Sequence, residues 1–172
     1  YLDALEREAP HDARAWAAAA AELFHRGRPA AAERAATRAI ELGTDYTTYT
    51  IRARCRGDLG RIEAALADMD QAVALVPEFW LAYLDRAPLR AGHGDLTGAM
   101  ADVDQAVALA RPVDRPLALR VRSSVRAQLG DHQGALADQR ELQAGASTLA
   151  ALEAFAADDA TAMELLRRAV LA

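Results

Sequence analysis

The segment DQAVAL at positions 70–75 recurs unchanged at positions 104–109. The two copies are 34 residues apart, and self-similarity at a fixed period of this length is the mark of an array of structural repeats. One such repeat cannot bury its apolar face alone, so neighbouring repeats must stack on one another. The sequence therefore predicts a stacked array rather than a fold built around one central core.

Four glycines keep the same period. They are Gly27, Gly60, Gly94 and Gly130, at spacings of 33, 34 and 36 residues. An alanine follows each glycine by five residues, and a large apolar residue precedes each by eleven; the alanines are Ala32, Ala65, Ala99 and Ala135, and the apolar residues are Trp16, Tyr49, Tyr83 and Leu119. Because these marks share one phase at four places, we expect four repeats.

Each repeat is predicted to be two α-helices joined by a tight turn at the glycine. Between the turns, apolar residues stand three or four positions apart, as at Ile62, Leu66, Met69 and Val73, which is the spacing of one helix face. The 44 alanines favour helix, and no segment alternates with period two, so no strand is predicted. The first helices are expected at 13–26, 46–59, 79–92 and 115–129, and the second helices at 29–42, 62–75, 96–109 and 132–144.

This pattern of aromatic residue, glycine, alanines and closing proline (Pro77 in the second unit) resembles the tetratricopeptide repeat. The resemblance covers about residues 13–145 and implies an all-α, right-handed α-α superhelix whose first helices line a concave groove. It places repeats at 13–44, 46–77, 79–112 and 115–145. Residues 147–171 are expected to form a degenerate repeat or capping helices, because apolar residues such as Leu152, Phe155 and Leu166 continue the stripe.

Residues 1–10 carry the marks of the end of a repeat. Pro10 lies 67 residues before Pro77, in the phase of a closing proline, and Leu2 and Leu5 fall where a second helix would pack. The chain also lacks an initiator methionine. We interpret it as a piece of a longer protein, and the alternative is a built-in N-terminal capping helix.

The amino-acid composition indicates the kind of genome that encodes the protein and argues against some classes of partner. All 20 basic residues are arginine, and asparagine is also absent; both missing types have A/T-rich codons, which indicates a GC-rich, bacterial genome. The formal net charge is −5, so a nucleic-acid-binding surface is not expected. No apolar run is long enough to insert into a membrane. The single cysteine, Cys55, fits a reducing compartment, and a cytoplasmic location is predicted.

Arginine and aspartate recur sixteen residues apart in three repeats. The pairs are Arg52 with Asp68, Arg86 with Asp102, and Arg122 with Asp138, each joining a first helix to its second helix. Repeat one has Ala19 and Ala35 at these positions, so both partners are missing together, as an ion pair requires. We predict that each pair fixes how its two helices dock, since a guanidinium can hold a carboxylate by two hydrogen bonds. A catalytic reading is disfavoured, because a catalytic site should occur once.

The sequence offers no catalytic or metal-binding pattern. The four histidines, His11, His25, His93 and His132, show no metal-ligand spacing. Cys55 has arginines beside it, which can activate a thiol, but we interpret it as a core or groove-wall residue. No glycine-rich phosphate loop is present. We therefore expect no enzyme activity, no metal and no cofactor.

A partner is expected to bind in the groove of the first helices. These helices carry a formal charge of +8, and +5 remains after the three paired arginines are set aside, which favours an acidic partner. Pro88 has no backbone N–H to donate to the carbonyl of Leu84. Either the resulting kink widens this groove, or the proline is a tolerated substitution with no role in binding. The predicted groove residues are Arg14, Phe24, Thr47, Thr50, Arg54, Leu81, Leu84, Pro88, Leu117, Arg120 and Ser124.

The sequence thus predicts a protein–protein interaction scaffold that grips a partner segment in this groove. An acidic and apolar segment, with or without a free C-terminal carboxylate, would suit it. The lysine and asparagine of the family's carboxylate-binding arrangement are absent, so that activity is not implied. The alternatives are a regulatory or substrate-recruiting arm of a larger bacterial enzyme or signalling ATPase, and self-association through a terminal repeat.

Overall fold

The computed structural model describes residues 2–43 and 45–157, with side chains up to residue 147. These residues form nine helices and no strand. The helices are α1 (Leu2–Glu8), α2 (Ala13–His25), α3 (Pro29–Glu41), α4 (Tyr46–Asp58), α5 (Ile62–Leu75), α6 (Trp80–Gly92), α7 (Leu96–Leu109), α8 (Arg115–Gln128) and α9 (His132–Ala157). From α2 to α8, the observed helix ends lie within one residue of the predicted ends.

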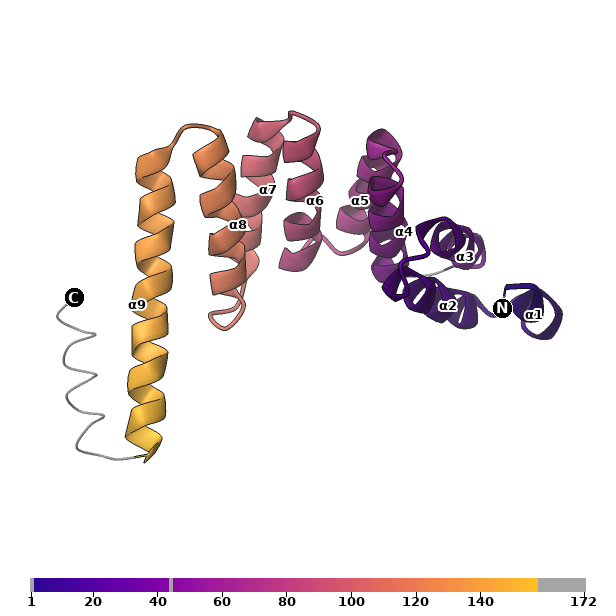
Figure 1. The fold of residues 1–172 in the computed structure, drawn as a ribbon, viewed down its shortest axis with the longest axis horizontal. Coiled ribbons are helices and arrows are strands. Elements are labelled where there is room, and N and C mark those ends of the chain that lie inside the picture. The colour runs from indigo at the N-terminus through magenta and orange to yellow at the C-terminus, as the bar shows by residue number, and fades with distance from the viewer. Residues whose placement is uncertain (1, 44, 158–172) are drawn as a thin grey trace. The chain divides into compact units, whose positions relative to one another are not determined.

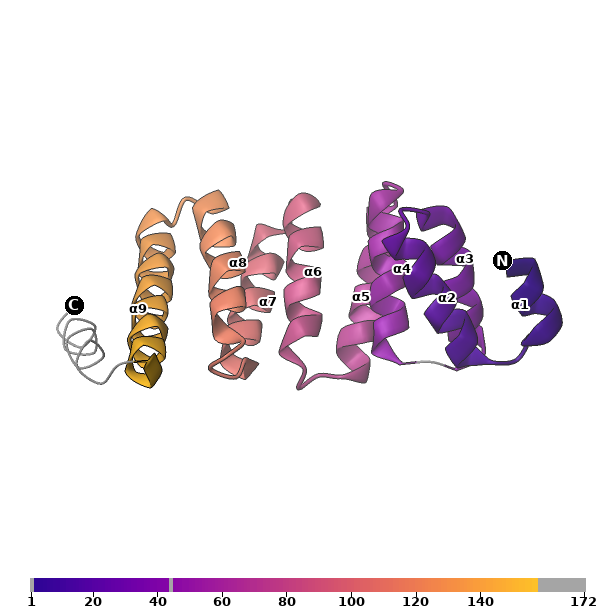
Figure 2. The same cartoon turned by 60° about the horizontal axis from the view of Figure 1, so that its bottom comes forward.

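Each predicted repeat is an antiparallel helix pair: α2 with α3, α4 with α5, α6 with α7, and α8 with α9 (Figures 1 and 2). A glycine makes each turn, and all four have a positive φ, between 66° and 90°. In the first turn the N–H of Arg28 donates to the carbonyl of Leu23 at 2.9 Å, which satisfies a carbonyl at the helix end. Glycine recurs because this backbone conformation strains other residues.

The chain divides into two compact units, Tyr1–Leu109 and Ala110–Ala172. In the first unit, α3 packs on α4 and α5 packs on α6, while α2 contacts α4 and α4 contacts α6. First helices of neighbouring repeats are therefore side by side in this unit. The core is built from alanines because small side chains let the helices approach closely; Ala20, Ala32, Ala65 and Ala99 have no exposed surface.

Helix α1 packs at the N-terminal end of the first unit. Its Leu2 and Leu5 contact the core cluster that contains Trp16. The indole Nε1 of Trp16 donates to the carbonyl of Ala9 at 3.2 Å, so the linker after α1 is also held. These contacts are those expected of a second helix that covers the next repeat, and a capping helix would make the same ones.

The second unit holds the helix pair α8 and α9, and here one prediction is wrong. We expected the last second helix to end at 144 and a new element to begin at 147, but α9 continues to Ala157. Gly145 does not adopt a positive φ, and no proline follows it, so nothing stops the helix. The hydroxyl of Ser147 donates to the carbonyl of Gln143, four residues back, at 2.9 Å. The rest of the predicted final unit, residues 158–171, lies outside the described residues.

None of the helices in the described part of the chain is both long and apolar enough to cross a membrane.

Candidate functional site

All three predicted arginine–aspartate pairs are in contact. The Nη2 atom of Arg52 lies 2.7 Å from Asp68 Oδ1, and its Nε lies 2.9 Å from Asp68 Oδ2. Arg86 holds Asp102 in the same two-bond geometry, at 2.6 and 2.9 Å. In the second unit Arg122 binds Asp138, with a shortest distance of 2.5 Å. The three carboxylates are buried, with at most 3% of each residue exposed.

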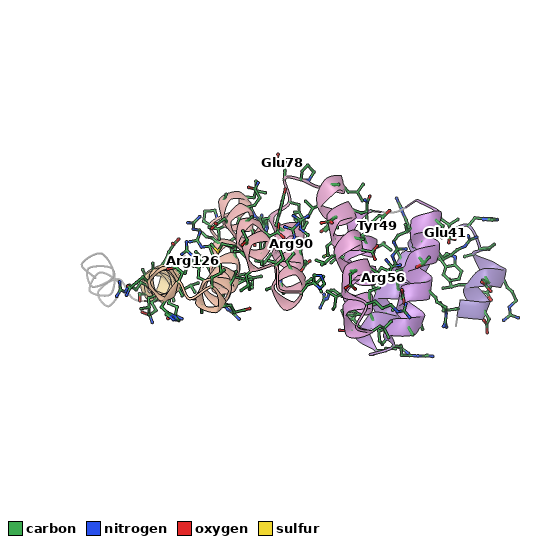
Figure 3. The ribbon with its side chains drawn as sticks, turned by 90° about the horizontal axis from the view of Figure 1, so that it is seen from above. Glu41, Tyr49, Arg56, Glu78, Arg90 and Arg126 are labelled. Carbon is green, nitrogen blue, oxygen red and sulfur yellow. The ribbon has the colours of Figure 1, made fainter. Side chains whose placement is uncertain are left out.

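A second arginine binds each of these carboxylates, and sequence reasoning missed it. Arg56 lies 2.9 Å from Asp68, Arg90 lies 3.1 Å from Asp102, and Arg126 lies 2.9 Å from Asp138. Figure 3 labels these three arginines. The signal was present in the sequence: each lies four residues after the first arginine, so both occupy one helix face. We call each set an Arg–Asp–Arg triad.

The second arginine of each triad also reaches the start of the second helix. The Nη1 atoms of Arg56, Arg90 and Arg126 donate to backbone carbonyls eight residues ahead, at 3.0–3.3 Å. The triad thus joins the first helix to both a side chain and the backbone of the second helix. The docking role that we predicted for the pairs stays a prediction, and the contacts assign it to three residues instead of two.

Repeat one has no triad. Its equivalent positions are Ala19, Leu23 and Ala35, and all three are buried in the apolar core cluster. The same helix pair is therefore built in two ways within one chain, once with apolar residues and three times with charges.

Arginines, including two of the triad members, also connect neighbouring repeats in the first unit. Glu33 of α3 binds Arg56 at 3.1 Å and Arg61 at 2.8 Å, which ties repeat one to repeat two. Arg86 binds Asp70 of α5 at 2.8 Å in addition to Asp102, which ties repeat two to repeat three. Burial lowers the pKa of Arg86, but these two carboxylates raise it by more, so the net shift is upward.

The second arginines correct our estimate of the charge on the first helices. Six arginines of these helices, not three, bind the buried aspartates. Setting all six aside lowers the formal charge from +8 to +2. The first helices therefore keep less unpaired positive charge than the sequence predicted, because six of their arginines bind aspartates of the second helices.

The predicted groove residues of the first unit differ in accessibility. Arg14, Thr47, Arg54 and Pro88 are exposed, and Phe24 and Leu81 are half-buried. Thr50 and Leu84 are buried, and the Thr50 hydroxyl donates to the carbonyl of Tyr46 at 3.1 Å. Both occupy the same position in their repeats and pack inside the array, so they offer a partner little surface.

Arg54 and Phe24 come together across neighbouring first helices. The guanidinium carbon of Arg54 on α4 lies 4.8 Å from the centre of the Phe24 ring on α2. This is a cation–π contact, which orients the guanidinium while leaving its N–H donors available. Among the described residues, Arg54 has no carboxylate within ion-pair distance.

Asp85 of α6 faces the same region, and sequence reasoning did not select it. Burial raises the pKa of Asp85, while the charge of nearby Arg54 lowers it by less. Burial also raises the pKa of Tyr46 on α4, with smaller contributions from Asp45 and Asp85. The equivalent residues in the other repeats are Ala18, Ile51 and Val121, so the signal that could have found Asp85 was an acid at an otherwise apolar position.

In the second unit, Leu117, Arg120 and Ser124 are exposed on α8. They are spaced three and four residues apart and so share one helix face.

The described residues contain no cluster of three or more histidine, cysteine or acidic side chains that could hold a metal ion. Cys55 is buried in the core. Burial raises the pKa of its thiol to about 11, and Asp58 and Glu33 add to this effect. The neighbouring arginines therefore do not activate it.

Comparison with solved structures agrees with this architecture. The crystal structure of MamA aligns with a TM-score of 0.77 at 14% identity, covering 86% of each chain. YrrB, described as a tetratricopeptide-repeat protein with an unusual peptide-binding site, aligns with a TM-score of 0.67 at 17% identity, over 81% of this chain and 71% of its own. The chain has the tetratricopeptide-repeat fold.

A second similar tetratricopeptide-repeat structure contains a bound peptide. The first such domain of Spaghetti (RPAP3), bound to an HSP90 peptide, aligns with a TM-score of 0.63 at 20% identity, over 70% of this chain and 98% of its own. No family model and no curated protein matches the sequence. The tetratricopeptide-repeat assignment therefore stands on three-dimensional structure and on the repeat pattern.

Proposed function

We propose that this protein is a protein–protein interaction scaffold and that a partner segment binds on the exposed side of α2, α4 and α6. We call this area the first-helix surface; its accessible residues are Arg14, Phe24, Thr47, Arg54, Leu81, Asp85 and Pro88. Similar folds that bind peptides, those of YrrB and RPAP3, support the class of function.

One observation carries the proposal: Arg54 is held over Phe24 without a carboxylate partner among the described residues. The six triad arginines have their hydrogen-bonding capacity directed into the repeats, but Arg54 has not. A partner carboxylate can therefore bind Arg54 while an apolar side chain of the same partner packs beside Phe24. The fixed position of the guanidinium lowers the entropy that binding must overcome.

The chemistry of the partner follows from the charges that remain. Because the surface keeps few cations, one carboxylate next to an apolar residue is a better match than a long acidic run. Asp85 lies near Arg54, so a hydrogen-bond donor on the partner can sit beside its carboxylate. The carboxylate that binds Arg54 can be an acidic side chain or the free C-terminus of the partner.

The test is affinity capture from lysate of the source, followed by direct binding of the captured segment to the purified chain. The variant is Arg54→Glu, and the control is Arg140→Glu, an exposed residue of α9 with the same change of charge. We expect the partner to be held by the wild type and the control and lost by Arg54→Glu. Equal retention by all three proteins would show that the first-helix surface is not the binding site.

Self-association through a terminal repeat is a separate part of the proposal. It predicts a molecular mass that rises with protein concentration in sedimentation equilibrium. A constant monomer mass across a hundredfold range of concentration would exclude it.

A further inference from the structure

A second surface with the character of a binding site lies at the end of α2 and along α3. Three adjoining hollows of about 390, 330 and 550 Å³ open there. The first and second share Arg28, and the second and third share Ala30 and Arg34, so they adjoin one another from the end of α2 along α3. We call these three hollows together the α3 trough; the lining residues that decide its charge are Glu22, Glu33, Glu41, Arg28 and Arg34.

Every carboxylate that lines the trough is already in an ion pair. Glu22 binds Arg26 at 2.6 Å, Glu41 binds Arg38 at 3.0 Å, and Glu33 binds Arg61 and Arg56. The acids are thus neutralised by arginines of the same region.

Two arginines of the trough are left over. Arg28 and Arg34 are both exposed, and among the described residues neither makes an ion pair or a side-chain hydrogen bond. Both border the middle hollow, whose other lining residues are Pro29, Ala30 and Ala31. Two free cations therefore face a small apolar floor, on a chain whose overall charge is −5.

We propose that the α3 trough binds an acidic segment of a partner protein, with Arg28 and Arg34 each holding one carboxylate. Arginine suits this task because its planar guanidinium can hold a carboxylate by two hydrogen bonds. Arg28, which directly precedes α3, and Arg34 are six residues apart, which corresponds to about 9 Å along the axis of an α-helix. A segment in the polyproline-II conformation rises about 3.1 Å per residue with three residues per turn, so two acidic residues separated by two others lie on one face, about 9 Å apart.

A protein segment fits this surface better than a nucleic acid does. Two cations can neutralise only two phosphates, and a polyanion would also meet the negative charge of the rest of the chain. A short segment with two carboxylates places its charges only where the cations are. The alanines and the proline between them leave room for small apolar side chains of the same segment.

The test uses a fluorescein-labelled peptide with two glutamates separated by two residues, and the same peptide with glutamine at both places. Binding to the whole chain is followed by fluorescence anisotropy at about 50 mM salt, where screening is weak. We expect the glutamate peptide to bind and the glutamine peptide to bind at least tenfold more weakly. The variant Arg28→Gln/Arg34→Gln should weaken the glutamate peptide by about tenfold, as expected for the loss of two exposed ion pairs.

The control is Arg7→Gln/Arg140→Gln, which removes the same charge from exposed arginines that lie outside both proposed sites. It should leave the affinity for the glutamate peptide within about twofold of the wild type. If both double variants lose affinity for the glutamate peptide equally, binding depends only on the net charge of the chain. That result would overturn the assignment of the binding site to the trough. The proposal would also be overturned if the glutamate peptide did not bind at about 1 mM. It would be overturned as well if only a single-stranded oligonucleotide bound in a way that depends on Arg28 and Arg34.

Discussion

Removing Asp102 should destabilise the protein more than removing the whole triad to which it belongs. Only 3% of Asp102 is exposed, and its carboxylate binds Arg86 and Arg90. The variant Asp102→Ala leaves two cations facing a site that has lost its negative charge, and one of them, Arg86, has a side chain only 11% exposed. Breaking a buried charge pair in this way costs about 3–5 kcal/mol.

Repeat one supplies the template for the compensating variant. The triple change Arg86→Ala/Arg90→Leu/Asp102→Ala gives repeat three the apolar residues that repeat one carries at these positions. Because no uncompensated charge then remains in the site, the triple variant should be more stable than Asp102→Ala by at least about 1 kcal/mol. It need not reach wild-type stability, since the lost arginine stems leave space.

Urea denaturation followed by circular dichroism measures both differences. At this chain length 1 kcal/mol corresponds to about 2–4 °C in melting temperature, so Asp102→Ala should also melt roughly 10 °C below the wild type. Asp70→Ala is the control, because it removes an exposed partner of Arg86 and should cost at most about 1 kcal/mol. If the triple variant is no more stable than Asp102→Ala, the burial of unpaired charge is not what makes the single change costly.

Three further predictions concern the first unit. Pro88→Ala should raise the free energy of unfolding by up to about 3 kcal/mol, because it restores a backbone donor inside α6; unchanged partner affinity in this variant would show that the proline has no role in binding. Asp85 has a raised pKa, so its ionisation opposes folding. The variant Asp85→Asn should therefore stabilise the protein at pH 7 and lose this advantage as the pH falls through the range in which aspartate is protonated. A gain in stability that persists in acid would contradict this. The Cys55 thiol, with a pKa of about 11, should not react with a disulfide reagent at pH 8 until urea unfolds the chain, and rapid labelling of the folded protein would refute its burial.

The triads show how far sequence reasoning reaches. Arg52 and Asp68 could be paired from the sequence because the interval of sixteen recurs and because both members are missing from repeat one. Arg56 recurs just as regularly, but its partner is the same aspartate, and a search for one-to-one pairs does not find it. Because these second arginines were counted as unpaired, the sequence analysis assigned too much unpaired positive charge to the first helices.

The sequence also could not say which predicted groove residues are accessible. Thr50 and Leu84 were selected by repeat phase, yet they are buried, because the angle between neighbouring first helices decides which positions stay open. The contact of Arg54 with Phe24 depends on the same angle.

What the sequence determined by itself is the local and periodic part of the structure. Turn glycines such as Gly27 fix where each helix pair turns, since they alone adopt the required positive φ without strain, and the spacing of apolar residues fixes which helix faces are buried. Tertiary structure decided what depends on distances between separate helices: which carboxylate each arginine binds, and that Arg28, Arg34 and Arg54 form no ion pair among the described residues. Side chains as long as arginine reach acids on several neighbouring helices, so their partners are set by packing and not by sequence interval.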